Sequence, residues 1–257
     1  MHFTFLGSSG AVPALLRDTT SIVFAGDGDA VLVDCGGSPA QKLLRAGVEP
    51  AALSRVVITH IPPDHVYGLP SLVETLYLSG RQAPLRLACR EEHEPALRAL
   101  LGVFRQLERP EIFPILWEPV PARERFALGD LGSFAITASP NAHGSMPNIA
   151  VRFEAPGRPP VVYSSDTEPC EAVVRLALGA HTLIHEATFS ERRTKRFGVH
   201  STAAEAGEIA ARAGVRRLIL AHIDVAHHED LEGHRDVART RFSGEVEVAR
   251  ELVPYPL

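Results

Sequence analysis

The sequence has few cysteines and no long apolar segment. Its 257 residues include three cysteines, Cys35, Cys89 and Cys170, an odd number of widely spaced thiols. This pattern argues against a disulfide framework and predicts a reducing, cytoplasmic setting. No unbroken apolar run reaches the roughly 18 residues that a transmembrane helix needs, so we expect no membrane partner.

Lysine and net positive charge are also scarce. Only Lys42 and Lys195 are lysines among the 26 basic residues, and the formal net charge is −5. This balance excludes a broad basic coat for nucleic acid. Hydrophobic residues make up 45% and charged residues 22%, as in an ordinary globular core. One residue type stands in excess: the chain has 12 histidines, whose positions need an explanation.

The order of predicted elements indicates one domain, residues 1–257, built on two packed sheets. Apolar, β-branched segments between turn residues predict strands at 2–6, 21–25, 30–34, 55–59, 85–89, 149–153, 161–163, 182–185, 217–221 and 246–249, and a β-rich stretch at 111–141. Helices are predicted at 41–45, 70–78, 91–104, 168–178, 202–213 and 231–242. Consecutive strands often lack an intervening helix. An α/β sandwich of four layers, αββα, therefore fits better than a doubly wound parallel sheet.

Two local signals are sharper than the rest. Thr202 and Glu205 match a capping box, and Gly214 provides the stop of that helix. The segment 60–65 is predicted to be a loop, because Pro62 and Pro63 disfavour a helix interior and a central strand.

Residues able to bind metal recur directly after predicted strands. They are His60, Asp64, His65, His143, Asp166, Glu186 and His222. Because the residue that follows a buried strand lies at the edge of its sheet, several such edges can converge on one pocket. Imidazole and carboxylate groups suit zinc, manganese and iron, so the pattern indicates a metal site.

The segment THIPPDHVYGLP, residues 59–70, resembles the T-H-x-H-x-D-H-x-x-G-L-P signature of the metallo-β-lactamase superfamily. Its surroundings resemble the ribonuclease Z branch in order along the chain: LGSSGAVP at 6–13, Arg17, Ser21, VLVDCG at 31–36, YSSDT at 163–167, HEATF at 185–189, HST at 200–202 and LAHI at 220–223. The resemblance implies the metallo-β-lactamase fold and a metal-dependent hydrolase, a ribonuclease Z-like phosphodiesterase. It also implies one or two divalent ions, zinc foremost, with manganese or iron as alternatives, and a homodimer.

The resemblance assigns roles residue by residue. One metal site would comprise His60, His143 and Asp166, and the other Asp64, His65 and His222, with Asp166 bridging. A metal-activated water would be the nucleophile.

Three residues would take part in the chemistry itself. Asp64 would orient or deprotonate the water. His200 would protonate the leaving oxygen, and Glu186 would orient that imidazole.

The chain departs from the signature at one ligand. Pro62 replaces the second histidine and cannot bind a metal, so the first site keeps two histidines and one aspartate. Three such ligands still form an open catalytic set. A two-metal site with a weaker first ion, a one-metal site and a degraded site remain open; we favour a retained but asymmetric centre.

The second departure is the size of the chain. Ribonuclease Z of the bacterial type carries a long arm between its third and fourth metal motifs that grips tRNA, whereas here His143 and Asp166 are only 23 positions apart. We therefore expect a phosphodiester that is a small molecule or an RNA end, and not a full tRNA. The basic cluster Arg192, Arg193, Lys195 and Arg196 precedes His200 and is a candidate contact for the substrate phosphate.

Two other functions remain open at this point. The same fold hosts many reactions, so hydrolysis of another ester or a lactone is one alternative. A metal-poor binding protein without catalytic activity, suggested by Pro62, is the other. The seven histidines without an assigned role are expected to be structural.

Overall fold

The structure, a computed structural model, describes residues 1–191 and 198–257. It contains two seven-stranded sheets packed face to face. The order in the first sheet is β14-β1-β2-β3-β4-β5-β6, with bounds β14 (Pro254–Pro256), β1 (His2–Gly7), β2 (Ser21–Ala25), β3 (Ala30–Val33), β4 (Leu53–Ile58), β5 (Leu85–Arg90) and β6 (Ile115–Val120). The order in the second is β13-β12-β11-β10-β9-β8-β7, with bounds β13 (Glu245–Val248), β12 (Arg217–Ala221), β11 (Thr182–Glu186), β10 (Arg158–Tyr163), β9 (Ile149–Ala155), β8 (Phe134–Pro140) and β7 (Phe126–Leu131).

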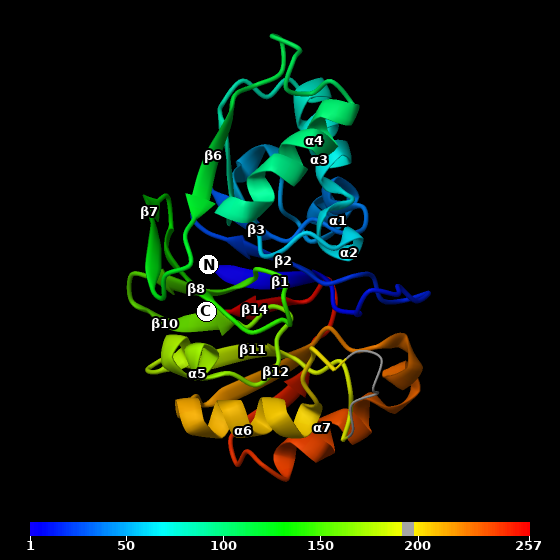
Figure 1. Cartoon of the computed structure of the whole chain (residues 1–257), viewed down its shortest axis with the longest axis vertical. Helices are drawn as coiled ribbons and strands as arrows, with labels where there is room; N and C mark the ends of the chain where they lie inside the picture. The colour runs from blue at the N-terminus through cyan, green and yellow to red at the C-terminus, as the bar shows by residue number, and fades with distance from the viewer. Residues whose placement is uncertain (192–197) are drawn as a thin grey trace.

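Helices cover the outer face of each sheet (Figure 1). The first sheet carries α1 (Pro39–Arg45), α3 (Leu69–Leu78) and α4 (Glu94–Val103), with the one-turn helix α2 (Pro63–Val66) at its edge. The second carries α5 (Glu171–Ala177), α6 (Ala203–Ala213) and α7 (Leu231–Arg239). The predicted αββα sandwich is therefore confirmed. The described part of the chain contains no helix that is long and apolar enough to cross a membrane.

Strand alternation builds three apolar layers. In β4, Val57 faces the space between the sheets, whereas Val56 and Ile58 pack under the helices of the first sheet. The middle layer is rich in aromatic rings, and those of Phe24 and Phe153 stack across the two sheets with centroids 3.6 Å apart. Side chains of successive strand residues point to opposite faces, so continuous apolar runs are the expected sequence of strands buried on both sides.

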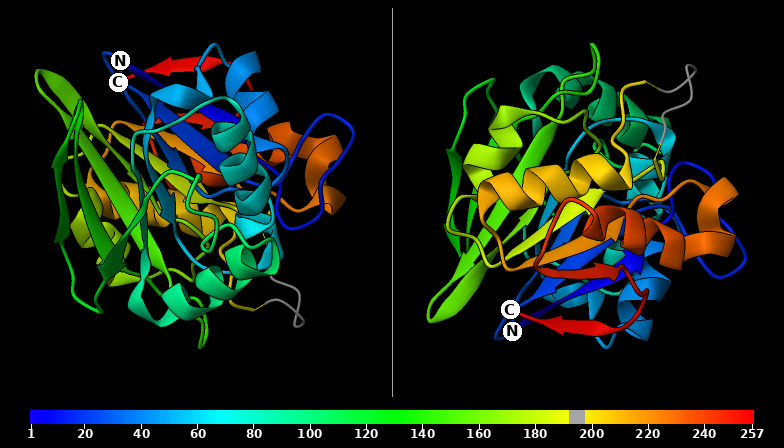
Figure 2. Two further views of the ribbon diagram at one scale, coloured as in Figure 1. Left: turned by 90° about the horizontal axis from the view of Figure 1, so that it is seen from above. Right: turned by 90° about the horizontal axis from the view of Figure 1, so that it is seen from below.

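Strand direction determines where the site forms. Strands β3 to β6 are parallel, as are β10 to β13, and β8 runs in the same direction as β10 because each is antiparallel to β9. Segments that leave the carboxyl ends of such strands meet at one edge of the sandwich. Figure 2 shows the long loop after β1 and the segment after β12 side by side at that edge, and the two termini next to each other.

Most local predictions were right, but several differ from the structure, which also has unpredicted 3₁₀ turns at Pro50–Ala52 and Val225–Asp230. Helix α6 has the predicted capping box of Thr202 and Glu205, with Gly214 in the left-handed conformation that ends it. The loop predicted at 60–65 is wrong in its second half, because Pro63 stands at the first position of α2, where a missing N–H costs nothing. The helix predicted at 91–104 begins with a 3₁₀ turn, Glu91–His93. The short edge strand β14 was not predicted.

Candidate metal centre

Strand β4 and helix α2 deliver the first group of candidate ligands. His60 follows the carboxyl end of β4, and Asp64 and His65 lie on α2, all three buried. The loop after β3 holds α2 in place, since the Cys35 N–H donates to the His65 carbonyl at 2.7 Å. Gly36 is required at this contact, because a Cβ there would lie 2.0 Å from the Asp64 carbonyl oxygen.

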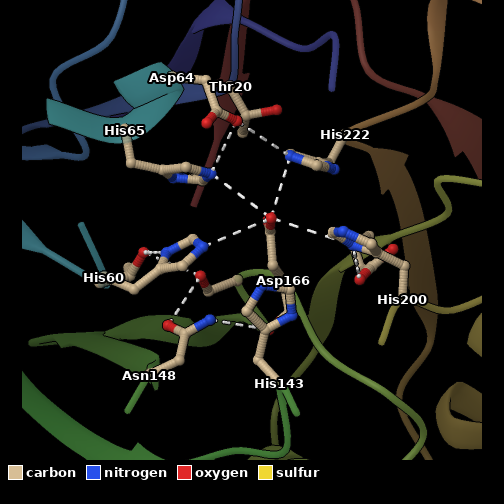
Figure 3. Close-up of polar contacts among 12 residues, drawn as sticks. Thr20, His60, Asp64, His65, His143, Asn148, Asp166, His200 and His222 are labelled. Atoms are coloured by element: carbon tan, nitrogen blue, oxygen red, sulfur yellow. Dashed lines mark hydrogen bonds and ion pairs between the residues drawn. The ribbon is translucent and has the colours of Figure 1, made fainter. Parts of the chain in front are cut away.

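The second sheet delivers the other candidates. Asp166 follows β10, Glu186 ends β11 and His222 follows β12. His143 comes from the connection between β8 and β9, and His200 lies two residues before the N-cap of α6. Figure 3 shows the side chains of Asp166, His143, His200 and His222 pointing toward those of His60, Asp64 and His65.

The structure brings the predicted ligands together in the two predicted groups. His60, His143 and Asp166 place one ligand atom each within 4.8 Å of one another, and so do Asp64, His65 and His222. Asp166 lies between the groups. Its Oδ2 is 3.5 Å from Nε2 of His60, 3.5 Å from Nε2 of His65 and 3.1 Å from Nε2 of His222 (Figure 3).

Each ligand imidazole is anchored through Nδ1. His65 Nδ1 donates to Asp34 at 2.9 Å, and His143 Nδ1 donates to the Val199 carbonyl at 3.0 Å. The hydroxyl groups of Thr59 and Thr188 lie 3.1 Å from Nδ1 of His60 and of His222. A proton on Nδ1 leaves the lone pair on Nε2, which is the atom that faces the centre.

The polar atoms at the centre fit a divalent cation. Nε2 of His60, His65 and His222 and Oδ1 of Asp166 are buried without a hydrogen-bond partner in the described part of the chain. Buried polar atoms are nearly always satisfied. Imidazoles held by second partners and aimed at shared carboxylates are the usual surroundings of a bound metal.

Electrostatics favour the ligand forms of Asp64, Asp166 and His60. Burial opposes the charge on His65, but Asp166 and Asp34 outweigh it and raise the pKa of that imidazole, so a bound cation would have to displace its proton. Burial opposes ionisation of Asp64 and Asp166, but neighbouring His222 and His65 outweigh it and hold the pKa of both carboxyl groups well below its usual range. Burial and the proximity of His65 lower the pKa of His60 to about 4, so its imidazole is neutral at pH 7. Metal binding requires these deprotonated forms.

His200 and Glu186 form a separate pair beside the centre. His200 Nδ1 lies 2.8 Å from Glu186 Oε1, and 3.9 Å from Asp166 Oδ2. Burial opposes the charge on His200, but Glu186 outweighs it and raises the pKa of the imidazole to about 9. Glu186 also accepts hydrogen bonds from the Thr167 and Thr188 backbone N–H groups, so its carboxylate is held rigidly.

Pro62 stands at the position of the missing ligand. It is the N-cap of α2, with φ −59° and ψ 153°, and its carbonyl accepts from the His65 N–H at 3.0 Å. Its ring has no donor atom for a metal, so the group of His60, His143 and Asp166 receives nothing from this position.

The sequence interpretation gave no role to several residues that position the ligands. Asp34 accepts from Thr59 N–H and Thr59 Oγ1 as well as from His65, and it is fully buried. Thr188 donates to Glu186 Oε2 at 2.8 Å. Asp34 lies in VLVDCG and Thr188 in HEATF, so the motifs contained the signal, but motif matching alone does not show which partner each residue holds.

Three residues of the centre have a left-handed backbone without being glycine. Asp34, Ser165 and His222 have φ of 59°, 54° and 54°. Such conformations cost on the order of 1–3 kcal/mol each and persist where the surrounding structure imposes them, often at functional sites.

The predicted substrate contacts Arg192, Arg193, Lys195 and Arg196 lie outside the described residues.

Comparison with known proteins identifies the family of the chain. Residues 29–223 match the family model described as the beta-lactamase superfamily domain. The ribonuclease Z of Methanothermobacter thermautotrophicus is 31% identical over 281 aligned positions, which cover 88% of each chain.

Two solved structures have the same fold over nearly the whole chain. The metallo-beta-lactamase fold protein YhfI of Bacillus subtilis is 25% identical, with a TM-score of 0.80 over 99% of this chain and 98% of that one. The short form of human tRNase Z is 21% identical, with a TM-score of 0.81 over all of both chains. The chain therefore belongs to the metallo-β-lactamase superfamily and, within it, to the ribonuclease Z family.

Proposed function

We propose that this chain is a metal-dependent phosphodiesterase of the ribonuclease Z type that hydrolyses a small or flexible phosphodiester. A cyclic nucleotide, a short RNA end and a bis-aryl phosphate are candidate substrates. The observation that carries the proposal is the His200–Glu186 pair, 2.8 Å apart, beside two groups of metal-binding side chains. This arrangement combines a proton donor with a place for cations, as phosphodiester cleavage needs.

The ligand groups would hold two divalent ions, zinc first among the candidates. One ion would be held by His60, His143 and Asp166, and the other by Asp64, His65 and His222, with Asp166 shared. Ions bound there supply Lewis acidity, which activates water and offsets the negative charge of the phosphoryl group.

The protein's own side chains supply orientation and the proton. The ionised Asp64 accepts a hydrogen bond from the attacking water and orients it. His200 is protonated at neutral pH and uses Nδ1 to bind Glu186, which leaves its Nε2–H to protonate the leaving oxygen. Glu186 keeps the imidazole in this orientation and stabilises its charge.

The connection between His143 and Asp166 argues against a full tRNA as substrate. The structure describes all of these residues, and they form a short loop, the hairpin of β9 and β10 and the segment after β10, with no inserted arm. The alignment with the archaeal relative extends over 281 positions although this chain has 257 residues, so the relative has insertions that this chain lacks. The proposed basic contacts Arg192, Arg193, Lys195 and Arg196, the homodimer and the cytoplasmic location stay predictions.

Hydrolysis assays on purified, zinc- or manganese-loaded protein test the proposal. We expect turnover of bis(p-nitrophenyl) phosphate and of at least one natural phosphodiester from a panel of cyclic nucleotides and short RNA ends. Absence of turnover on the whole panel, in protein shown to contain metal, would refute the function.

A lactone or another ester is the competing substrate class on this fold. If a phosphodiester is the substrate, His200 is the group that protonates its leaving oxygen. We therefore expect His200→Ala to lower hydrolysis of the natural phosphodiester, whose alkoxide leaving oxygen needs a proton, by about 10²–10⁴-fold, the contribution of a general acid, with the metal content unchanged. His181→Ala is the control, because His181 lies at the opposite end of β11. Equal activity of His200→Ala and His181→Ala would favour the lactone class, and protein that binds no metal at saturation would favour a binding protein.

A further inference from the structure

A hollow of about 490 Å³ adjoins the candidate metal centre on the side of Asp64. It is lined by residues of the loop after β1 and of α2 with its flanks: Ala11, Pro13, Thr19, Pro63, Asp64 and Tyr67. Asp64 thus belongs both to the metal-binding group and to the wall of this hollow. A molecule bound at the centre would therefore reach the hollow directly.

Helix α2 presents an aromatic ring beside the carboxylate. Tyr67 follows Asp64 by three positions, so both side chains lie on the same face of the helical turn. The Tyr67 N–H donates to the Pro63 carbonyl at 2.9 Å, which extends the turn to Tyr67. Tyr67 is 48% exposed, although Asp64 and His65 on the same helix are buried. An exposed ring at a site offers a face for stacking.

The opposite wall is held in place from the centre. Gly10 N–H donates to the Ile223 carbonyl at 2.9 Å, next to His222. Ser9 Oγ donates to the Val12 carbonyl at 2.7 Å, and Thr20 Oγ1 donates to the Ser9 carbonyl at 2.8 Å. The loop of Ala11 and Pro13 is therefore positioned by the same segment that carries a metal-binding residue.

The charged side chains in the wall of the hollow indicate which kind of chemical group it can bind. Among the described residues of its wall, Asp64 carries the only carboxylate and none is a lysine or arginine. Arg17, on the same loop, binds Ser8 Oγ at 2.8 Å and lines a different pocket together with Lys42 and Asp18. The described wall offers a second phosphate no basic side chain of its own, whereas an uncharged flat group would meet proline and tyrosine.

Resting on the phosphodiesterase function proposed above, we infer that this hollow binds an uncharged, flat ester group of the substrate, such as a nucleobase or an aryl ring, stacked on Tyr67. The group is the one that stays on the phosphate. His200 protonates the leaving oxygen. Seen from Asp64, His200 lies on the far side of Asp166 and His222, so the leaving group is on the side away from the hollow (Figure 3). The enzyme is accordingly specific for mononucleotide-like or aryl phosphodiesters over simple alkyl ones.

Two esters with the same leaving group test this inference. The zinc-loaded protein is assayed with the p-nitrophenyl ester of thymidine 5′-monophosphate and with methyl p-nitrophenyl phosphate. We expect kcat/KM to be at least about tenfold higher for the thymidine ester, the effect of one stacked base. Tyr67→Ala should remove this preference through KM with little change in kcat. Leu78→Ala is the control, because Leu78 is 73% exposed and lines, together with Tyr67, the groove between α3 and α4 but not the hollow.

Because Tyr67 lines both the hollow and the groove, the preference must survive in Leu78→Ala for the hollow to be the binding place. Equal kcat/KM for the two esters, or a preference that survives Tyr67→Ala, overturns the inference and leaves the phosphodiesterase function intact. If metal-containing protein hydrolyses neither ester, the proposed phosphodiesterase function is refuted. Calorimetry then compares the binding of thymidine 5′-monophosphate with that of methyl phosphate, which tests occupation of the hollow independently of catalysis. Tighter binding of the nucleotide that is lost in Tyr67→Ala supports the inference, and equal binding overturns it.

Discussion

The carboxylate of Asp34 holds Nδ1 of His65 at 2.9 Å, and both side chains are fully buried. This contact joins the end of β3 to α2 and leaves Nε2 of His65 directed at Asp64 and Asp166, 3.3 Å and 3.5 Å away. Asp34 therefore determines the orientation and the basicity of a candidate ligand without facing the ion itself.

Asp34→Asn should weaken metal binding. The amide keeps the shape of the side chain but removes the charge that raises the basicity of His65. Loss of such a partner typically costs about 10–100-fold in metal affinity. Competition with a chromophoric zinc chelator measures the change, and Asp27→Asn, in the exposed turn between β2 and β3, is the control. Unchanged zinc affinity in Asp34→Asn would contradict this role.

Pro62→His should complete the first ligand group. The backbone at position 62, φ −59° and ψ 153°, is accessible to any residue, so a histidine there needs no change of backbone conformation. We expect tighter binding of the ion held by His60, His143 and Asp166, by about tenfold or more for one added ligand, a factor typical of single contacts at metal sites.

The matched control for this substitution is Pro62→Ala, which removes the ring without adding an imidazole. Equilibrium dialysis and calorimetry with zinc measure the stoichiometry and the affinity of each step. If Pro62→His behaves like Pro62→Ala in both measurements, the asymmetry of the centre has another origin.

Removal of metal should lower thermal stability. A cation that binds only the folded chain stabilises it by about 4 kcal/mol at a thousand times its Kd, which corresponds to roughly 10 °C in Tm for a chain of this length. Thermal unfolding with and without a chelator measures the shift. His222→Ala, which removes a ligand of the second group, should reduce this dependence strongly, and a full shift in that variant would count against the ligand assignment.

Acid should lower the free energy of unfolding through protonation of His234. Burial, together with His227, lowers the pKa of His234 to about 4 in the folded state, whereas the unfolded chain has the ordinary value of 6.5. Below pH 6.5 the unfolded state binds the proton first, so stability is complete above pH 6.5 and falls as the pH decreases toward 4.

The size of this effect should be about 1–3 kcal/mol across that window. Urea unfolding of the wild type and of His234→Gln at several pH values measures it, because glutamine cannot titrate. The variant should lose less stability than the wild type between pH 6.5 and 4. Parallel pH dependence in the two proteins would show that other groups, such as His60, carry the acid response.

Sequence alone determined much of the architecture and most of the candidate ligands. Apolar strand segments, the capping box of Thr202 and Glu205, and ligand residues that follow strands are local signals, and the structure has them where they were expected. The departure at Pro62 and the short span from His143 to Asp166 were also visible in the sequence. These features depend on neighbours within a few residues, or on order along the chain.

Only the tertiary structure decided which residues hold the ligands. Asp34 and His65 are 31 positions apart, Thr188 and His222 are 34 apart, and the Ser165 and Thr59 hydroxyl groups, 106 apart, meet at 2.8 Å. The hollow beside Asp64 needs the loop of Ala11 and Pro13 to lie against Tyr67. Such contacts depend on how two sheets pack through many buried side chains, and no local pattern encodes the sum of those interactions.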